Sequence, residues 1–216
     1  MKYKTIAVIG LGQFGTTIAK MFASMHHEVL GVDINPEIVQ KVAPYVTHAI
    51  VADTTDEEAI KALALSQFDI VIVAIGDNVQ ANLMTSMLLK EMNMPHVVSK
   101  AESDLHGKML KKMGVDMVIY PEYDVAQRLA QSLTREHVMD YLQLSKSISL
   151  IEVDMPKFLV GTCLKDSNLR EKYNLNAVGI RRGEDLEVPP NPFTILSAED
   201  KLLIIGNNSD LDALTV

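Results

Sequence analysis

The sequence predicts an α/β protein in which a Rossmann-type doubly wound parallel sheet is followed by a crossover helix and a small α+β domain. Up to Pro121, six short runs of consecutive apolar residues alternate with helix-forming segments, the pattern of parallel strands covered by helices on both faces. The first run leads directly into a glycine-spaced turn. After Pro121 the alternation stops, and strand-like pieces punctuated by glycine and proline follow.

The six apolar runs are the expected strands of the first domain, which we place at residues 1–122. They lie at residues 6–9, 29–32, 49–52, 70–75, 96–99 and 117–120. The segments between them are rich in helix formers and lie at residues 16–25, 36–43, 57–65, 79–92 and 105–113. Pro36 fits the first turn of its helix, and Gly114 sits where a helix would stop. Such a series of β/α steps makes one Rossmann-type domain.

A single long amphipathic helix is expected over residues 124–144, within a linking segment at residues 123–145. Its apolar stripe would comprise Val125, Leu129, Leu133, Val138, Tyr141 and Leu142. Residues 146–216 then form the small α+β domain. Its strand-like pieces lie at residues 149–153, 177–180, 187–188 and 201–205, with one short helix at residues 169–173.

Composition and charge indicate a globular, acidic chain. The hydrophobic fraction is 48%, the charged fraction is 22% and the formal net charge is −8, so a nucleic-acid-binding face is not expected. Cys163 is the single cysteine, which leaves no internal disulfide. The first residues lack the length and flanks of a signal peptide, and no apolar run reaches the roughly 20 residues that cross a bilayer. We therefore expect a cytosolic protein that reaches a membrane only through a partner.

The segment VIGLGQFG carries the G-x-G-x-x-G spacing directly after a strand and at the start of a helix. Gly10 allows the tight turn, Gly12 lets a phosphate approach the backbone, and Gly15 lets helix and strand pack closely. The helix N-terminus offers free N–H groups and a partial positive charge to an anion. Asp33 ends the second strand, where a carboxylate accepts ribose hydroxyls and would repel a 2′-phosphate. This combination favours a bound adenosine nucleotide over glycines that merely close a β/α turn.

Polar residues follow three further strands. They are Asp53 and Thr55, then Gly76, Asp77 and Asn78, then Lys100. The carboxyl ends of parallel strands share one edge of the sheet, where ligands of open α/β folds bind. Each residue alone is equally well explained by loop solvation or helix capping, and Asp77 in particular fits an N-cap. Their shared edge favours a ligand site.

The residues do not favour an enzyme. A dehydrogenase needs an acid–base group over its cofactor, yet the small domain contains no histidine, and Cys163 has no histidine near it in sequence. No H-x-x-x-H or C-x-x-C metal spacing occurs. The remaining alternatives are an NAD-dependent oxidoreductase or redox sensor, for which Asp33 favours NAD over NADP, and an assembly module whose nucleotide never exchanges.

Seven segments carry a family resemblance, in the order VIGLGQFG, EVLGVDIN, THAIVADTTDE, DIVIVAIGDNVQANL, SKAES, MGVDMVIYPEYDVAQRLA and LREKYNLNAVGIRRG. They resemble the RCK or KTN regulatory subunits of bacterial potassium channels and Ktr or Trk transporters, over essentially the whole chain. The resemblance implies a cytoplasmic subunit, peripheral on the inner face of the plasma membrane, that gates a membrane pore subunit through ligand-dependent changes of ring shape. It also implies dimers that assemble into a ring, commonly octameric, with the crossover helix joining neighbours.

The resemblance further implies a site for ATP or ADP, or alternatively NAD or NADH, in the first domain. By this comparison Asp33 and Asn35 hold the ribose, Asp53 and Thr55 lie near the adenosine, and Lys100 neutralises phosphate. Glu122 matches the family's PE glutamate and would place Mg or Ca by the terminal phosphate at a subunit interface. The full set of implied binding residues is Gly10, Gly12, Gln13, Phe14, Gly15, Asp33, Ile34, Asn35, Asp53, Thr54, Thr55, Ala74, Ile75, Gly76, Asn78, Lys100 and Glu122.

Two departures from the family pattern bear on ligand choice. Gln13 stands where Ktr-type members usually carry an arginine, so a charge-assisted contact to the terminal phosphate is lost and discrimination of ATP from ADP is left open. Some relatives bind cyclic di-AMP in the small domain through paired isoleucines and an arginine. The matching positions here are Leu164 and Lys165, with Asn168 and Arg170 retained. The alternative for Arg170 is a salt bridge with a nearby acid.

Overall fold

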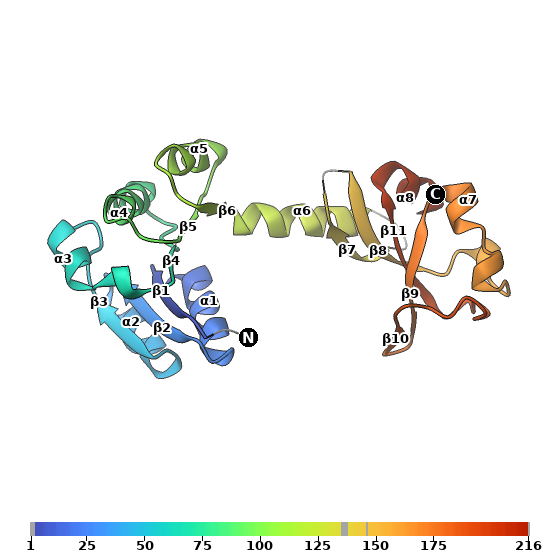
Figure 1. Cartoon of the computed structure of the whole chain (residues 1–216), viewed down its shortest axis with the longest axis horizontal. Helices are drawn as coiled ribbons and strands as arrows, with labels where there is room; N and C mark the ends of the chain where they lie inside the picture. Colours follow the sequence, from blue (N-terminus) through green and yellow to red (C-terminus); the bar gives the residue numbers. More distant parts are fainter. Residues whose placement is uncertain (1–2, 135–137, 146, 216) are drawn as a thin grey trace. The chain divides into compact units, whose positions relative to one another are not determined.

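The computed structural model describes residues 3–134, 138–145 and 147–215, which divide into two compact units, Met1–Glu122 and Tyr123–Val216 (Figure 1). The first unit holds a six-stranded parallel sheet in the order β3-β2-β1-β4-β5-β6. The strands in sheet order are His48–Val51, Glu28–Asp33, Thr5–Ile9, Ile70–Val73, Val97–Lys100 and Met117–Ile119. The predicted doubly wound parallel sheet is confirmed.

Five helices cover the sheet, and alternate residues of each central strand face opposite layers. In β1, Ile6 and Val8 face one layer while Ala7 and Ile9 face the other. Helices α1 and α2 pack on the first layer, and α3, α4 and α5 supply residues to the second. Burying both faces explains the unbroken apolar runs, because each fully buried branched side chain contributes about 1.5–3 kcal/mol. The helices are Gln13–Ser24, Pro36–Val42, Glu57–Ala62, Val79–Glu91 and Asp104–Lys112.

Strand β1 lies at the point where the strand order reverses. It pairs with β2 on one side and with β4 on the other, so the connections that leave β1 and β4 run to opposite faces of the sheet. Open α/β sheets leave a crevice at such a switch point, outside the carboxyl ends of the strands. The fold therefore places the glycine turn after β1 at the natural ligand position.

The predicted helix over residues 124–144 is correct only in its first part. Helix α6 spans Pro121–Thr134, and Val138–Gln143 form strand β7, so the helical prediction is wrong over those six residues. Strand β7 pairs antiparallel with β8, which aligns Leu142 with Leu150. The spacing of apolar residues in this window fits a helix as well as a strand, and pairing with a distant strand decides between them. Residues 135–137 of the prediction lie outside the described residues.

The second unit is a small α+β fold, as predicted. Its antiparallel sheet has the strand order β10-β9-β11-β8-β7. Strands β8, β9, β10 and β11 are Ile148–Asp154, Asn176–Arg182, Asp185–Glu187 and Lys201–Asn207. Helices α7, Leu169–Tyr173, and α8, Asn208–Thr215, contribute Leu169, Leu211 and Leu214 to one apolar core with the sheet.

Among the residues that the structure describes, no helix combines the length and the apolar character that a bilayer crossing requires.

Candidate functional site

A cavity of about 590 Å³ lies at the carboxyl ends of the parallel strands, within the range of about 300–1,000 Å³ that small-molecule sites occupy. Sixteen of the predicted site residues line it: Gly10, Gly12, Gln13, Phe14, Asp33, Ile34, Asn35, Asp53, Thr54, Thr55, Ala74, Ile75, Gly76, Asn78, Lys100 and Glu122. Of the five other lining residues, Asp77 was among the strand-end polar residues that the sequence singled out, whereas Ile9, Ile38, Ala52 and Ala81 were not. The structure thus gathers residues from five strand ends around one hollow.

The remaining predicted residue, Gly15, lies behind the cavity wall. A Cβ atom there would collide with the carbonyl oxygen of Gly10, so α1 can sit on the turn only with glycine at this position. Gly10 itself has φ +88°, in the left-handed region, and its N–H donates to the carbonyl of Val32 at 2.8 Å. A Cβ on Gly12 would meet nothing within 4 Å, because this residue faces the cavity. Gly15 therefore shapes the turn without touching the hollow.

Helix α1 begins without a side-chain cap. Its N-cap is Gly12, whereas the next four helices each have a side chain that accepts a hydrogen bond from a first-turn amide. Those capping residues are Asn35, Asp56, Asn78 and Ser103. The cap of α4 is thus Asn78, not Asp77 as the sequence suggested. First-turn amides without a cap carry unpaired donors and the positive end of the helix dipole, and here they border the cavity.

Asp33 is held in place by two backbone amides. Its Oδ2 accepts from the Leu11 N–H at 2.6 Å, and its Oδ1 accepts from the Asn35 N–H at 2.8 Å. A carboxylate oxygen can accept two hydrogen bonds, so each oxygen keeps one acceptor position. The side-chain oxygen of Asn35 accepts from the Glu37 N–H, which leaves its NH₂ group as the part that can reach a ligand. The arrangement suits two neighbouring hydroxyl groups.

Asp53 is fixed across the cavity by Thr55, whose N–H and hydroxyl both donate to Asp53 Oδ1, at 2.9 and 2.7 Å. These hydrogen bonds from Thr55 hold the pKa of Asp53 below its usual value. The neighbouring Thr54 is buried, and its hydroxyl lies 2.9 Å from that of Thr85 on α4. The loop after β3 is therefore anchored to α4 while it presents an ionised carboxylate to the cavity.

Lys100 ends β5 and forms an ion pair with Glu122. Its Nζ lies 2.6 Å from Glu122 Oε1, and the Lys100 residue is 8% exposed. This hydrogen bond lowers the pKa of Glu122, which is therefore ionised at neutral pH. A Cβ placed on Gly76 would come within 2.9 Å of the ammonium, so a larger residue there would push the ammonium aside. The ammonium is within reach of an anion in the cavity, and such an anion would compete with Glu122.

The described residues contain no cluster of three or more histidine, cysteine, aspartate or glutamate side chains suited to a metal ion. Glu122 alone cannot hold a divalent cation. Mg²⁺ is commonly bound by one or two carboxylates together with substrate phosphates and water. Glu122 consequently fits a cation that is shared with a bound nucleotide or with another copy of the chain.

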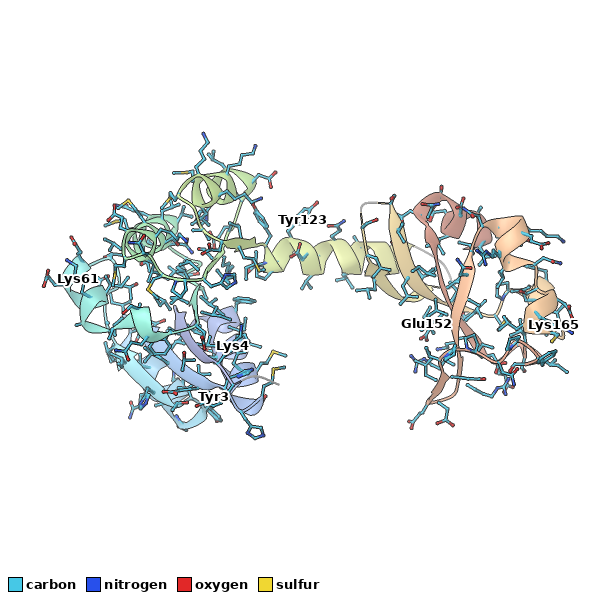
Figure 2. All side chains as sticks on the ribbon, viewed as in Figure 1. Tyr3, Lys4, Lys61, Tyr123, Glu152 and Lys165 are labelled. Carbon is cyan, nitrogen blue, oxygen red and sulfur yellow. The ribbon has the colours of Figure 1, made fainter. Side chains whose placement is uncertain are left out.

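A second cavity, of about 550 Å³, lies in the second unit. The four residues of the second-ligand prediction, Leu164, Lys165, Asn168 and Arg170, all line it. Lys165, labelled in Figure 2, comes from the segment between β8 and α7, and its ammonium lies 4.9 Å from the centre of the Phe193 ring. Lys165 and Arg170 outnumber the one carboxylate in the lining, Glu171, and this excess of positive charge favours an anionic ligand.

Sequence reasoning missed a set of buried polar residues directly behind the first cavity. Asn82, Thr85 and Ser86 of α4 are fully buried, together with Leu89. They follow the i, i+3, i+4, i+7 spacing of one helix face, which was the signal available in the sequence. His106 of α5 is 2% exposed, and its Nε2 lies 3.2 Å from Asn82 Oδ1.

The fold and the site define a class: a Rossmann-type domain with an open cavity at its strand ends, joined to a small α+β domain. Within that class the two units match two family models, the TrkA-N domain over residues 6–121 and the TrkA-C domain over residues 148–215. The chain belongs to the TrkA-N/TrkA-C, or RCK, family. The family resemblance noted in the sequence is confirmed.

Two relatives from Bacillus subtilis (strain 168) are similar over nearly the whole chain. Ktr system potassium uptake protein C is 41% identical over 208 residues, 96% of this chain and 94% of the relative. Ktr system potassium uptake protein A is 41% identical over 211 residues, 98% of this chain and 95% of the relative. Both relatives are named for potassium uptake and not for a chemical reaction.

The solved structures agree on the fold. A GsuK channel bound to NAD superposes with a TM-score of 0.68 at 18% identity, over 99% of this chain. The match spans 39% of that channel's chain. At this identity the comparison shows the fold alone.

Proposed function

We propose that the chain is the cytoplasmic regulatory subunit of a Ktr-type potassium uptake system. In this proposal its strand-end cavity binds an adenine nucleotide, and the bound nucleotide changes the shape of an assembly that acts on a membrane pore subunit. The relatives named for Ktr potassium uptake support the biological role, and their coverage of 94% and 95% indicates the same domain content. No bond needs to be broken, because differential affinity of about 1–3 kcal/mol between two shapes suffices for such coupling.

One observation carries the nucleotide proposal: α1 begins without a side-chain cap at the wall of a cavity that also presents Asp33 and Lys100. A phosphate would receive the free first-turn amides, while the ribose hydroxyls would take the remaining acceptor positions of Asp33. Lys100 would then neutralise the phosphate that lies farther from the ribose. ATP, ADP, NAD and NADH all contain the adenosine diphosphate part that this arrangement fits. The GsuK channel structure with bound NAD is consistent with this, because NAD contains the same adenosine diphosphate part.

The proposal also includes self-association into dimers and a ring. Val125, Leu129 and Leu133 are spaced by four along α6, and their exposed fractions are 55%, 56% and 76%. An apolar stripe of this exposure on one helix indicates a surface that pairs with a partner. An octameric ring is the assembly that the family resemblance implies, and the membrane partner would be a potassium pore subunit.

A divalent cation, Mg or Ca, would bind where Glu122 meets the terminal phosphate. The pair of Glu122 with Lys100 supports this placement, since a phosphate that takes Lys100 leaves the Glu122 carboxylate free beside it. The second cavity is the proposed place for an anionic ligand of the cyclic di-AMP type, on the strength of Lys165 and Arg170 in its wall.

A thermal-shift panel tests the proposal with ATP, ADP, AMP, NAD, NADH and cyclic di-AMP, each with and without Mg or Ca. A ligand at 100 times its Kd stabilises the folded chain by about 2.7 kcal/mol, so a true ligand raises Tm by several degrees. Dialysis followed by titration then shows whether the nucleotide exchanges, as a sensor requires. A chain that no adenine nucleotide stabilises would contradict the proposal, and hydride transfer to any substrate would indicate an oxidoreductase instead.

A further inference from the structure

The side-chain amide of Asn82 is fully buried and uses its whole hydrogen-bonding capacity. Its Nδ2 donates to the carbonyl of Ile75 at 2.9 Å and to the carbonyl of Lys100 at 3.1 Å. Its Oδ1 accepts from the Ser99 hydroxyl at 3.0 Å and lies 3.2 Å from His106 Nε2. The four partners lie on three segments: the stretch after β4, strand β5 and helix α5. Such a buried amide is a strong constraint, because the loss of any one hydrogen bond leaves a buried polar group unpaired.

The two carbonyls held by Asn82 lie beyond the end of the β4–β5 ladder. The last paired residues of these strands are Val73 and Ser99, so sheet hydrogen bonds between the two strands stop before Ile75 and Lys100. Past that point the Asn82 amide bridges the two segments. Both segments continue into the cavity wall, and Gly76 lies against the Lys100 ammonium. Lys100 stays paired with Ile119 of β6, and beyond the β4–β5 ladder Asn82 ties the segment that holds Gly76 to it.

His106 fixes the orientation of Asn82. The ring is buried in α5, with Nε2 toward Asn82 Oδ1 and Nδ1 accepting from the Glu102 N–H at 3.4 Å. This pattern requires the neutral ring with its hydrogen on Nε2, and burial lowers the pKa of His106 in the same direction. Because the only acceptor of the Asn82 amide is its oxygen, the Nε2–H group favours the orientation in which the NH₂ group points toward the two carbonyls.

We propose that Asn82, oriented by His106, is a positioning residue for the phosphate end of the cavity. It acts by holding the Gly76 and Lys100 segments at the separation that a phosphate requires. This inference rests on the proposed nucleotide site and names residues that touch no ligand themselves. It distinguishes phosphate from adenosine: only the wall around Lys100 depends on Asn82, whereas Asp33 is oriented by Leu11 and Asn35.

The test compares ADP with adenosine, measured by calorimetric displacement on the full chain. Asn82→Ala and His106→Phe remove the constraint, while His106→Gln keeps an N–H donor near the Nε2 position. Ser86→Ala is the matched control, since Ser86 is equally buried in α4 and donates to Ser99 Oγ without holding a wall carbonyl. We expect Asn82→Ala and His106→Phe to weaken ADP about tenfold and adenosine less than about threefold. His106→Gln and Ser86→Ala should keep the wild-type ratio of the two affinities.

Equal weakening of ADP and adenosine, or the same ratio in Asn82→Ala as in Ser86→Ala, would overturn the positioning role and leave only a contribution to stability. Should Asn82→Ala fail to fold, the contrast between His106→Phe and His106→Gln decides the question by itself. Failure of the wild-type chain to bind either ligand would instead overturn the proposed function, and this inference with it. The two failures are thus separate results.

Discussion

Asp33 and Glu122 are two carboxylates of the first cavity that differ in how they are held. Asp33 is oriented by two backbone amides, so its geometry exists before any ligand arrives. Glu122 is a side chain with 68% exposure that is engaged with Lys100, so it can change partner. Asp33 is therefore suited to recognising a ligand, and Glu122 is suited to changing its contacts when a ligand binds. A single substitution tests each role.

Replacing Asp33 with alanine should weaken ATP and ADP binding by at least about tenfold, because two charge-assisted hydrogen bonds to ribose are lost. The same change also frees the Leu11 and Asn35 amides, so Tm without ligand must be measured alongside. Asp56→Ala is a useful comparison, since it removes the cap of α3 at a residue that does not line the cavity. Nucleotide affinity that stays within twofold in Asp33→Ala means that the ribose assignment is wrong.

Replacing Glu122 with glutamine should abolish the dependence of ATP affinity on Mg or Ca, since a neutral amide is a poor ligand for hard cations. With a chelator present, ATP should bind the variant at least as tightly as the wild type, because Lys100 no longer has a competing carboxylate. Titrations with and without cation measure both effects. Glu102→Gln is the control near the same lysine. An unchanged cation dependence in Glu122→Gln would remove Glu122 from the site.

At the scale of elements, the strands of the first unit could be predicted closely because two-sided burial leaves unbroken apolar runs such as TIAVI and EVLGVD. The positions of their carboxyl ends could be predicted as well, and the residues at those ends make up most of the cavity lining. Strand β7 could not be predicted, because the spacing of its apolar residues fits a helix as well as a strand. Its pairing with β8 decides between the two. Asn82 and His106 were also missed, because polar residues on a helix face resemble a solvated face until burial is known.

The loop before β11 should give the second unit an acid-sensitive stability. Asp200 is 2% exposed and accepts two hydrogen bonds from Arg182, at 2.8 Å each, and these hold the pKa of Asp200 below its usual value. A lowered folded pKa contributes stability above the unfolded value of about 3.9, and that stability is lost as pH falls through the folded pKa.

Replacing Asp200 with asparagine should therefore destabilise the second unit by about 1–3 kcal/mol at neutral pH and flatten its response to acid. Amide hydrogen exchange of β9 and β11 between neutral pH and pH 3 measures both effects. Glu199→Gln is the control for a neighbouring exposed carboxylate. A variant as acid-sensitive as the wild type would show that other groups control the transition.

At the scale of the whole molecule, the apolar stripe of α6 predicts that the chain associates with copies of itself. The double substitution Leu129→Glu and Leu133→Glu should weaken association by tenfold or more, because each buried leucine contributes about 1.5–3 kcal/mol. Sedimentation velocity over a range of concentrations measures this. Met21→Glu is a matched control, being 55% exposed on α1. A wild-type chain that is monomeric at every concentration would contradict both the stripe's role and the proposed assembly.

The ion pair of Lys100 with Glu122 has a consequence for selectivity among small anions. A carboxylate tethered beside the ammonium acts like a competitor at millimolar effective concentration, present at all times. In the proposed mode of binding, free inorganic phosphate has no ribose to contact Asp33, so it would compete with the Glu122 carboxylate less well than a nucleotide would. A nucleotide bound as proposed would contact both the glycine turn and Asp33, so it would displace Glu122 from Lys100 more readily. The proposed site would in this way favour nucleotides over the simple anions of the cell.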